Sequence, residues 1–276
     1  EMTTAQIIGF QNGSDGLNED SIIACIKHFP GSGPQMDGID MAPIVGDEES
    51  LQTHLMPYYA ALEVNVAAIM PYYSSSVYLD MTTAALGSEI VLQDLLRDEM
   101  GFDGIIQTDW GLNHTVAALA GADALGGAGQ REVDKLVENL TVEQLDERVG
   151  RLLTAKFDLG LFENPYVDVE NAVATVGCEE HVALVREAAA KAMTLVKYEN
   201  VSALEGQQII LAGSLAEDTN ALSSGWKIEN YTAKSIRTAI EERAGAENVT
   251  YIADDVSQVQ DSYPEGTTAI VVVGEA

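Results

Sequence analysis

The chain has 276 residues, of which 46% are hydrophobic and 21% are charged, a composition typical of a globular protein that can bury a sizeable core. Its 14 Lys and Arg against 44 Asp and Glu give a net charge of −30. Because this acidity is spread along the whole chain, it would repel a polyanion and argues against a nucleic-acid partner. No run of about eighteen apolar residues predicts a membrane span.

The dispersed acidity favours a halophilic protein that stays soluble in a high-salt milieu, where screening removes the self-repulsion. An ordinary acidic protein is the alternative, and the cellular compartment stays open. The two cysteines, Cys25 and Cys178, predict neither a disulfide framework nor a paired metal-ligand spacing. We therefore expect two free thiols, no metal and no cofactor.

The first half of the chain alternates short apolar runs with amphipathic segments, a pattern that predicts repeated βα units around a parallel sheet. The predicted helices are residues 49–63 and 88–99. The predicted strands are residues 22–29, 66–70, 104–108 and 122–125. The fold class expected from this order is α/β.

A long amphipathic helix is predicted over residues 142–161, and Gly160 and Pro165 mark its end. A second helix follows at 180–197, and strands at 208–213, 249–253 and 269–273 indicate a separate α/β unit. The predicted domains are residues 1–162, a linker with a connecting helix over 163–205, and an incomplete second domain over 206–276. The second domain is expected to be incomplete because the chain stops directly after an apolar strand.

Polar and aromatic side chains gather where three predicted strands end. Lys27 and His28 close the first strand, Tyr73 follows the second, and Asp109 and Trp110 follow the third. Parallel barrels carry their active sites at these ends, and this set of side chains suits a sugar with polar hydroxyls and an apolar ring face. Any one of these residues alone would as readily indicate a turn or a cap. No phosphate-binding glycine loop is present.

The run Lys27-His28-Phe29-Pro30-Gly31, followed by the segment from Gly101 to Trp110, closely resembles glycoside hydrolase family 3. The likeness extends through residues 159–166, through Gly225-Trp226 and through residues 273–275. This resemblance implies the C-terminal half of a (β/α)8 TIM-type barrel, followed by a truncated α/β sandwich domain. The rest of the barrel is then expected from a longer chain or from a partner.

The same resemblance implies a role for each matching residue. Asp109 would be the nucleophile of a retaining mechanism, and Trp110 and Trp226 would flank the aglycone. Lys27 and His28 would donate hydrogen bonds to the sugar hydroxyls, and Tyr73 would lie near the nucleophile. This agrees with attack by a carboxylate through an oxocarbenium-like transition state. A Lys-His pair at a strand end could instead serve a structural ion pair.

The loop over residues 31–43 departs from the N-acetylglucosaminidase branch of the family, because it contains Asp37 and Asp40 but no histidine. The resemblance then implies that the acid/base is a glutamate of the second domain, just beyond Ala276. Glu275 is kept as the less favoured candidate, since the family pattern makes it the first glutamate of that motif and not the catalytic one. Asn230 replaces an expected second aromatic residue, which leaves the acceptor preference open.

Together these patterns predict an exo-acting, β-glucosidase-like hydrolase that cleaves β-linked glucosides or oligosaccharides through a covalent intermediate on Asp109. The alternatives are a non-catalytic carbohydrate-binding or pseudoenzyme fragment, and a β-xylosidase or N-acetylhexosaminidase of the same family. His54, His114 and His181 lie in predicted helices without a partner at metal-ligand spacing. A structural role is expected for them.

Overall fold

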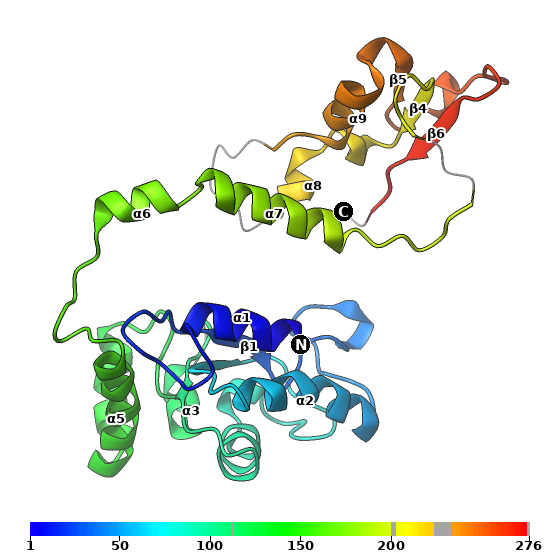
Figure 1. Cartoon of the computed structure of the whole chain (residues 1–276). Helices are drawn as coiled ribbons and strands as arrows, with labels where there is room; N and C mark the ends of the chain where they lie inside the picture. The colour runs from blue at the N-terminus through cyan, green and yellow to red at the C-terminus, as the bar shows by residue number, and fades with distance from the viewer. Residues whose placement is uncertain (112, 200–202, 224–232, 275–276) are drawn as a thin grey trace. The chain divides into compact units, whose positions relative to one another are not determined.

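The computed structural model describes residues 1–111, 113–199, 203–223 and 233–274. The chain divides into two compact units, Glu1–Val176 and Gly177–Ala276 (Figure 1). The division falls inside the segment 163–205, which the sequence analysis assigns to a linker and a connecting helix.

The first unit contains three parallel strands, β1, β2 and β3, and a set of helices around them. The strands are β1 (Cys25–Phe29), β2 (Ala68–Pro71) and β3 (Ile105–Ile106). The α-helices are α1 (Met2–Gln11), α2 (Glu48–Leu62), α3 (His114–Leu119), α4 (Gln130–Asn139), α5 (Val142–Asp158) and α6 (Val169–Thr175), and the shorter or irregular helices are η1 (Met36–Gly38), η2 (Ala85–Gly87) and the π-helix η3 (Ile90–Glu99).

The strands of the first unit form one sheet in the order β1-β2-β3. Both pairings are parallel, with Ile26 opposite Ile69 and Ile69 opposite Ile106. Helix α2 connects β1 to β2, and η3 connects β2 to β3. The predicted βα repeats are therefore confirmed over these three strands.

The prediction of a fourth strand over residues 122–125 was wrong. In this segment only Ala124 forms a parallel bridge, an isolated one to Gln107. The reason is that the Asp123 carboxylate, and not a backbone carbonyl, accepts the N–H of Ile106 at 2.7 Å. The backbone N–H groups of Asp123 and Ala124 both donate to the Ile106 carbonyl, at 2.8 and 3.1 Å. The segment follows β3 but does not continue its ladder.

Alternate side chains of the sheet enter two different hydrophobic clusters, as expected when both faces of a parallel sheet are covered. Ile69 and Ile106 pack in the larger cluster with residues of α1, α2 and η3, among them Ile7, Leu55 and Leu92. Their neighbours Ala68 and Ile105 pack with Leu152 and Ala155 of α5.

Capping interactions define where the two longest helices begin. At α2, the Asp47 carboxylate accepts the Ser50 N–H at 2.8 Å, and the Ser50 hydroxyl accepts the Asp47 N–H at 2.8 Å. At α5, Thr141 and Gln144 form the same reciprocal pair. Such capping boxes satisfy backbone donors that a helix leaves free in its first turn.

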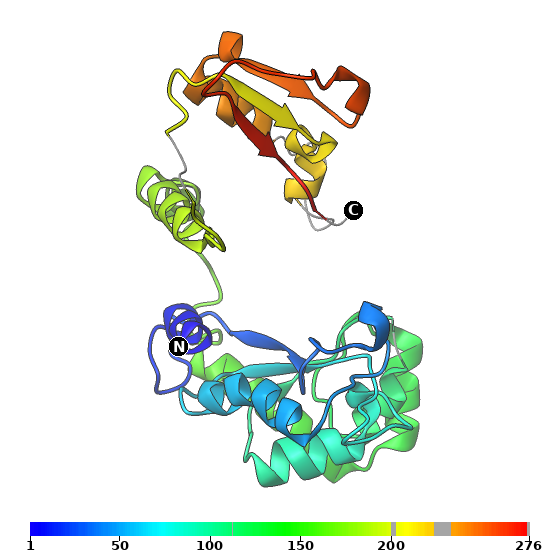
Figure 2. The ribbon, with the colours of Figure 1, turned by 90° about the vertical axis from the view of Figure 1, so that its right-hand side faces the viewer.

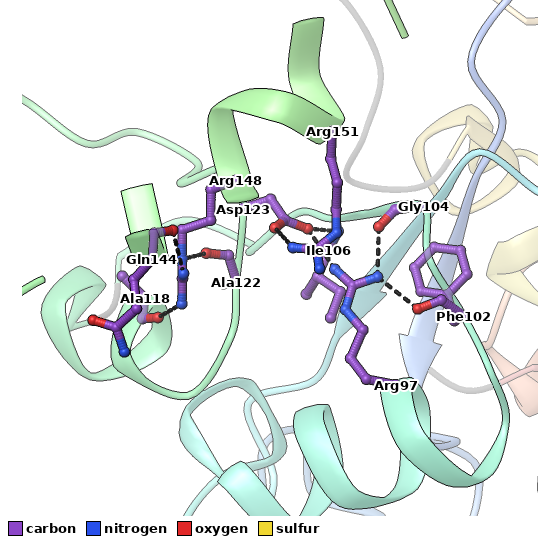
Figure 3. A network of polar contacts seen from close by, with 10 residues as sticks. All are labelled: Arg97, Phe102, Gly104, Ile106, Ala118, Ala122, Asp123, Gln144, Arg148 and Arg151. Atoms are coloured by element: carbon purple, nitrogen blue, oxygen red, sulfur yellow. Dashed lines mark hydrogen bonds and ion pairs between the residues drawn. The ribbon is translucent and has the colours of Figure 1, made fainter. Parts of the chain in front are cut away.

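A buried polar network joins α5 and η3 to the start of the segment that follows β3 (Figure 3). The Asp123 side chain has no exposed surface and pairs with Arg97 at 2.6 Å and with Arg151 at 2.8 Å. Arg97 also donates to the carbonyls of Phe102 and Gly104. Arg148 donates to the carbonyls of Ala118, Ala122 and Gln144. The Arg97 bonds lie at the amino end of β3, the end of a barrel that serves stability and not chemistry, whereas the Asp123 carboxylate bonds Ile106, the last residue of β3.

The second unit begins with helix α7 (Glu179–Ala192) and contains the parallel sheet β5-β4-β6. Its three arrows run in the same direction in Figure 2. The bounds are β4 (Ile209–Ala212), η4 (Ser214–Ala216), α8 (Thr219–Ser223), α9 (Ile236–Ala244), η5 (Ala246–Asn248), β5 (Val249–Ile252), η6 (Val256–Gln258) and β6 (Thr268–Val271). Ile209 and Leu211 of β4 pack against Ile240 and Ala244 of α9. The three predicted strands of this unit are confirmed.

Across the described part of the chain, none of the helices combines the length and the apolar character that crossing a membrane requires.

Candidate active site

The candidate site lies at the carboxyl ends of β1, β2 and β3. Because these strands are parallel neighbours, their carboxyl ends meet at one edge of the sheet. His28 lies in β1, Tyr73 follows β2, and Asp109 follows β3. The structure thus brings together four of the predicted residues: His28, Tyr73, Asp109 and Trp110.

Asp109 is the central carboxylate of this group. Its Oδ1 accepts the Trp110 backbone N–H at 2.8 Å, and its Oδ2 lies 3.5 Å from Nε2 of His28. The Asp109 side chain is 22% exposed and the His28 side chain 21%. One oxygen is held by the backbone while the carboxylate remains accessible from solvent.

His28 is a neutral imidazole near pH 7. Burial lowers the pKa of His28 below its ordinary value of 6.5, and the charge of Lys27 lowers it further. Asp109 opposes this shift of the pKa without reversing it. A neutral His28 can donate one hydrogen bond and accept another, so it can orient a hydroxyl beside the carboxylate.

Tyr73 supplies a second donor at this edge. Its hydroxyl donates to the Trp110 carbonyl at 2.6 Å. Burial raises the pKa of Tyr73 above 10, and the neighbouring Asp109 carboxylate raises it further. The phenol therefore keeps its proton at neutral pH. It connects the loop after β2 with the loop that carries Asp109.

Trp110 is 56% exposed, an unusual degree of exposure for a large aromatic side chain. Its indole lies against the backbone of Gly126 and Gly127. A flat apolar surface beside a carboxylate suits the apolar face of a sugar ring or of an aromatic aglycone.

Lys27 is exposed and lines, with His28, a cavity of about 210 Å³ that Ser32 and Pro57 also border. Within the ranges that the structure describes, Lys27 forms no ion pair, whereas His28 lies 3.5 Å from the Asp109 carboxylate, so a structural ion pair remains an alternative role for His28. The peptide bonds Lys27–His28 and Phe29–Pro30 are both cis.

Sequence reasoning missed a second layer around His28, formed by Tyr72, Asp40 and Gln35. The Tyr72 ring packs on the imidazole with 4.8 Å between the ring centroids. The Tyr72 hydroxyl donates to the Asp40 carboxylate and lies 2.7 Å from the side-chain amide of Gln35. The hydrogen bond from Tyr72 is the largest of the contacts that lower the pKa of the Asp40 carboxyl. The only available signal was the acidic loop 31–43, which sequence alone does not place next to a strand about 30 residues further on.

Two predicted residues, Trp226 and Glu275, lie outside the described residues. Within the described ranges, no group of three or more His, Cys, Asp and Glu side chains is placed to hold a metal ion.

A larger cavity, of about 570 Å³, lies at the amino ends of β2 and β3, bordered by Ala67, Gly104, Arg151 and Asp158 among others. Its position opposite the strand ends that bear Asp109 argues against a catalytic role. We therefore place the candidate active site at Asp109 and not at this larger cavity.

The chain matches known proteins along most of its length. A model of the glycosyl hydrolase family 3 N terminal domain matches residues 6–191. The probable beta-glucosidase C of Aspergillus flavus is 36% identical over 230 residues, 71% of this chain and 36% of the fungal protein. The periplasmic beta-glucosidase/beta-xylosidase of Dickeya chrysanthemi is 30% identical, over 78% of this chain and 40% of its own length.

Solved structures agree. The β-glucosidase from Listeria innocua in complex with glucose superposes with a TM-score of 0.73 and 25% identity, over 94% of this chain and 38% of that chain. For the exo-1,3/1,4-β-glucanase from a Pseudoalteromonas species, the TM-score is 0.75 at 23% identity, over 98% of this chain and 38% of that chain, a likeness of fold. This chain spans less than half the length of each of these four proteins. The family match over residues 6–191, together with the strand-end residues, shows that the chain belongs to glycosyl hydrolase family 3.

Proposed function

We propose that this chain carries the nucleophile and part of the substrate site of a retaining β-glycosidase. The observation that supports it most directly is the Asp109 carboxylate, accessible at the end of β3, with His28 at 3.5 Å and the Trp110 N–H at 2.8 Å. Asp109 would attack the anomeric carbon, expel the aglycone and form a covalent glycosyl-enzyme that water then hydrolyses.

The neighbours of Asp109 have distinct roles in this proposal. Neutral His28 and exposed Lys27 donate hydrogen bonds to the hydroxyls of the sugar that reacts, and these bonds strengthen as positive charge develops on the ring. Protonated Tyr73 holds the loop that bears Asp109. Trp110 forms one wall of the aglycone subsite, and Trp226 is proposed as another.

The proton donor would be a glutamate of the second domain of the whole protein, with Glu275 as the alternative within this chain. The remaining barrel strands would come from a longer polypeptide or a partner, as the greater length of the relatives suggests. No cofactor takes part in this chemistry.

The substrate class proposed is a β-linked glucoside or oligosaccharide, cleaved from its non-reducing end. The similarity to a probable beta-glucosidase and to a beta-glucosidase/beta-xylosidase supports a glucoside or a xyloside. One similar protein, from Cellulomonas fimi, is a beta-N-acetylglucosaminidase/beta-glucosidase, but the loop 31–43 of this chain has no histidine. The missing histidine disfavours the N-acetylhexosaminidase hypothesis. The higher identity to a β-glucosidase than to the β-glucosidase/β-xylosidase is the reason for favouring a glucoside over a xyloside.

A non-catalytic carbohydrate-binding role is the second candidate, because no proton donor has been assigned among the described residues. The two roles separate with 2,4-dinitrophenyl 2-deoxy-2-fluoro-β-glucoside, whose leaving group departs without acid assistance. Incubation of the full-length protein, followed by peptide mass mapping, should label the peptide that contains Asp109.

Two variants control this experiment. Asp109→Asn should abolish labelling. Asp103→Asn, an exposed carboxylate at the other end of β3, should label normally. A folded wild-type protein that takes no label, or a label on another carboxylate, would overturn the assignment of Asp109.

A further inference from the structure

We propose that the backbone of Gly126 and Gly127 is a seat that sets the orientation of the Trp110 indole. Thr108 and His114 are positioning residues that hold this seat. The inference rests on the proposed function, in which Trp110 forms a wall of the aglycone subsite. It deepens that function by naming the residues that determine aglycone preference without touching the aglycone.

The contact between the seat and the indole leaves no room for a side chain. A Cβ atom at Gly127 would lie 2.5 Å from Cδ1 and 3.0 Å from Nε1 of Trp110. At Gly126, a Cβ atom would lie 2.7 Å from the Thr108 carbonyl and 3.0 Å from Cε3 of Trp110. Two successive glycines therefore allow the backbone to meet the indole directly.

Two hydrogen bonds hold the seat from below. The Gly126 N–H donates to Oγ1 of Thr108 at 2.9 Å, and the Gly126 carbonyl accepts from Nε2 of His114 at 2.9 Å. Thr108 has no exposed surface and His114 is 7% exposed. Because a carbonyl can only accept, the proton of a neutral His114 resides on Nε2. Bonds buried in this way are costly to break, so they hold the backbone in one place.

The segment that leads into the seat is anchored at its other end as well. Figure 3 shows Arg148 donating to the Ala122 carbonyl and Asp123 accepting the Ile106 N–H. Between the two anchors, the Thr108 N–H donates to the Ala124 carbonyl at 2.9 Å. Residues 122–127 thus run beside β3 with both ends held.

The two glycines of the seat lie differently relative to the nucleophile. A Cβ atom at Gly126 would lie 3.0 Å from the Asp109 carbonyl, whereas the atoms nearest to a Cβ at Gly127 all belong to the Trp110 indole, so Gly127 is the position that tests the ring alone. Displacing the ring should therefore weaken binding of an aglycone or acceptor. Attack by water on a glycosyl-enzyme, from which the aglycone has already left, should change little.

A matched pair of substitutions tests the seat. Gly127 and Gly101 both have φ +73°, so alanine strains the backbone equally at the two positions. No heavy atom lies within 4 Å of a Cβ at Gly101, whereas Gly127→Ala collides with Trp110. The measurement uses the full-length protein. The emission of Trp110 is obtained by subtracting the spectrum of the same protein carrying Trp110→Phe, and it is then compared between Gly127→Ala and Gly101→Ala.

Gly127→Ala should shift the Trp110 emission and lower kcat/KM for aryl β-glucosides about fivefold or more, the loss expected for one aromatic contact. Reactivation of the 2-fluoroglucosyl-enzyme by water should stay within about twofold of wild type, while its acceleration by an added glucoside acceptor should fall about fivefold. Gly101→Ala should match wild type in all four quantities.

The positioning residues have their own conservative variants. Thr108→Val should reproduce the Gly127→Ala behaviour, and Thr108→Ser should restore it, because serine keeps the hydroxyl. His114→Gln should retain function, since its amide N–H can replace Nε2–H, and His114→Leu should not. These variants decide the matter if Gly127→Ala does not fold.

If Gly127→Ala and Gly101→Ala had the same Trp110 emission and the same acceleration by the acceptor, the proposal that Gly126 and Gly127 orient the indole would be overturned. A Thr108→Val variant that binds acceptors as Thr108→Ser does would overturn it as well. Failure of the wild-type protein to take the fluoroglucoside label would instead overturn the proposed function, and the fluorescence comparison would still decide whether Gly126 and Gly127 position Trp110.

Discussion

Asp123→Asn tests how much the network of Figure 3 stabilises the first unit. The carboxylate is fully buried and accepts from Arg97 at 2.6 Å, Arg151 at 2.8 Å and the Ile106 N–H at 2.7 Å. Asparagine has nearly the same shape, but it removes the negative charge and directs an NH₂ donor toward other donors. The Arg97 guanidinium, 7% exposed, then loses its counter-charge.

Removing one partner of a buried ion pair costs about 3–5 kcal/mol. Arg97 keeps its bonds to the Phe102 and Gly104 carbonyls, and Arg151 is 28% exposed and can be hydrated. We therefore expect a loss near the lower end, about 3 kcal/mol, which is a large part of the stability of a typical domain.

The assay is urea unfolding of the full-length protein, followed by hydrogen exchange of peptides from the first unit. Asp98→Asn is the control, because Asp98 is an exposed carboxylate next to Arg97 and bonds only to Gln93 in the described structure. It removes the same charge and should change stability by no more than about 0.5 kcal/mol. A difference between the two variants below about 1 kcal/mol would refute the argument that Asp123 holds this network.

Three further outcomes are expected. Because burial lowers the pKa of His28 below 6.5, the unfolded chain binds the proton first as pH falls. The stability due to neutral His28 is then present above pH 6.5 and is lost below it. The free energy of unfolding of the wild type minus that of His28→Asn should therefore decrease between pH 7.5 and about 5.5. A difference that stays constant with pH would contradict this. Tyr72→Phe should raise the pKa of the Asp40 carboxyl toward 3.8 in a carbon NMR titration, and an unchanged pKa would show that the bond contributes nothing in solution. With a net charge of −30, the protein should gain melting temperature in molar KCl, and circular dichroism unchanged between low and molar salt would count against the halophilic hypothesis.

The periodic spacing of apolar residues correctly predicted several helices and strands of the first unit. The predicted helices 49–63 and 142–161 correspond to α2 and α5, and the apolar runs around residues 25–29 and 68–71 form β1 and β2. Helix α2 buries its apolar face in the larger cluster, and the strands β1 and β2 contribute side chains to both clusters. Helix α1 was not predicted. Its apolar residues surround the helix, so that Ile7 is buried while Met2 and Phe10 are exposed, and no stripe marks it.

The strand-end pattern predicted which side chains would meet, because a parallel sheet brings all its carboxyl ends to one edge. His28, Tyr73, Asp109 and Trp110 follow from that rule alone. The layer behind them does not: Tyr72 reaches Asp40 across 32 residues. Such pairings depend on loop paths, which apolar periodicity does not encode.

The segment 122–127 is a second example of structure that apolar periodicity does not predict. Its apolar residues predicted a strand, but Asp123 replaces a ladder bond with a side-chain bond, and Gly126 and Gly127 end the run. In the sequence, Asp123 looks like an interruption of an apolar run. In the structure it is the anchor of the segment.

This anchor and the indole of Trp110 are connected through a few residues. Asp123 fixes the start of the segment on Ile106, and Thr108, two residues after Ile106, holds Gly126 under the indole. If residues 122–127 move together, Asp123→Asn should change the Trp110 emission in the native state, although Asp123 does not contact the indole. Asp98→Asn should leave the emission unchanged. A native emission identical in both variants would show that the Thr108 and His114 bonds hold the seat on their own, and that the network of Figure 3 stabilises the fold without reaching the site.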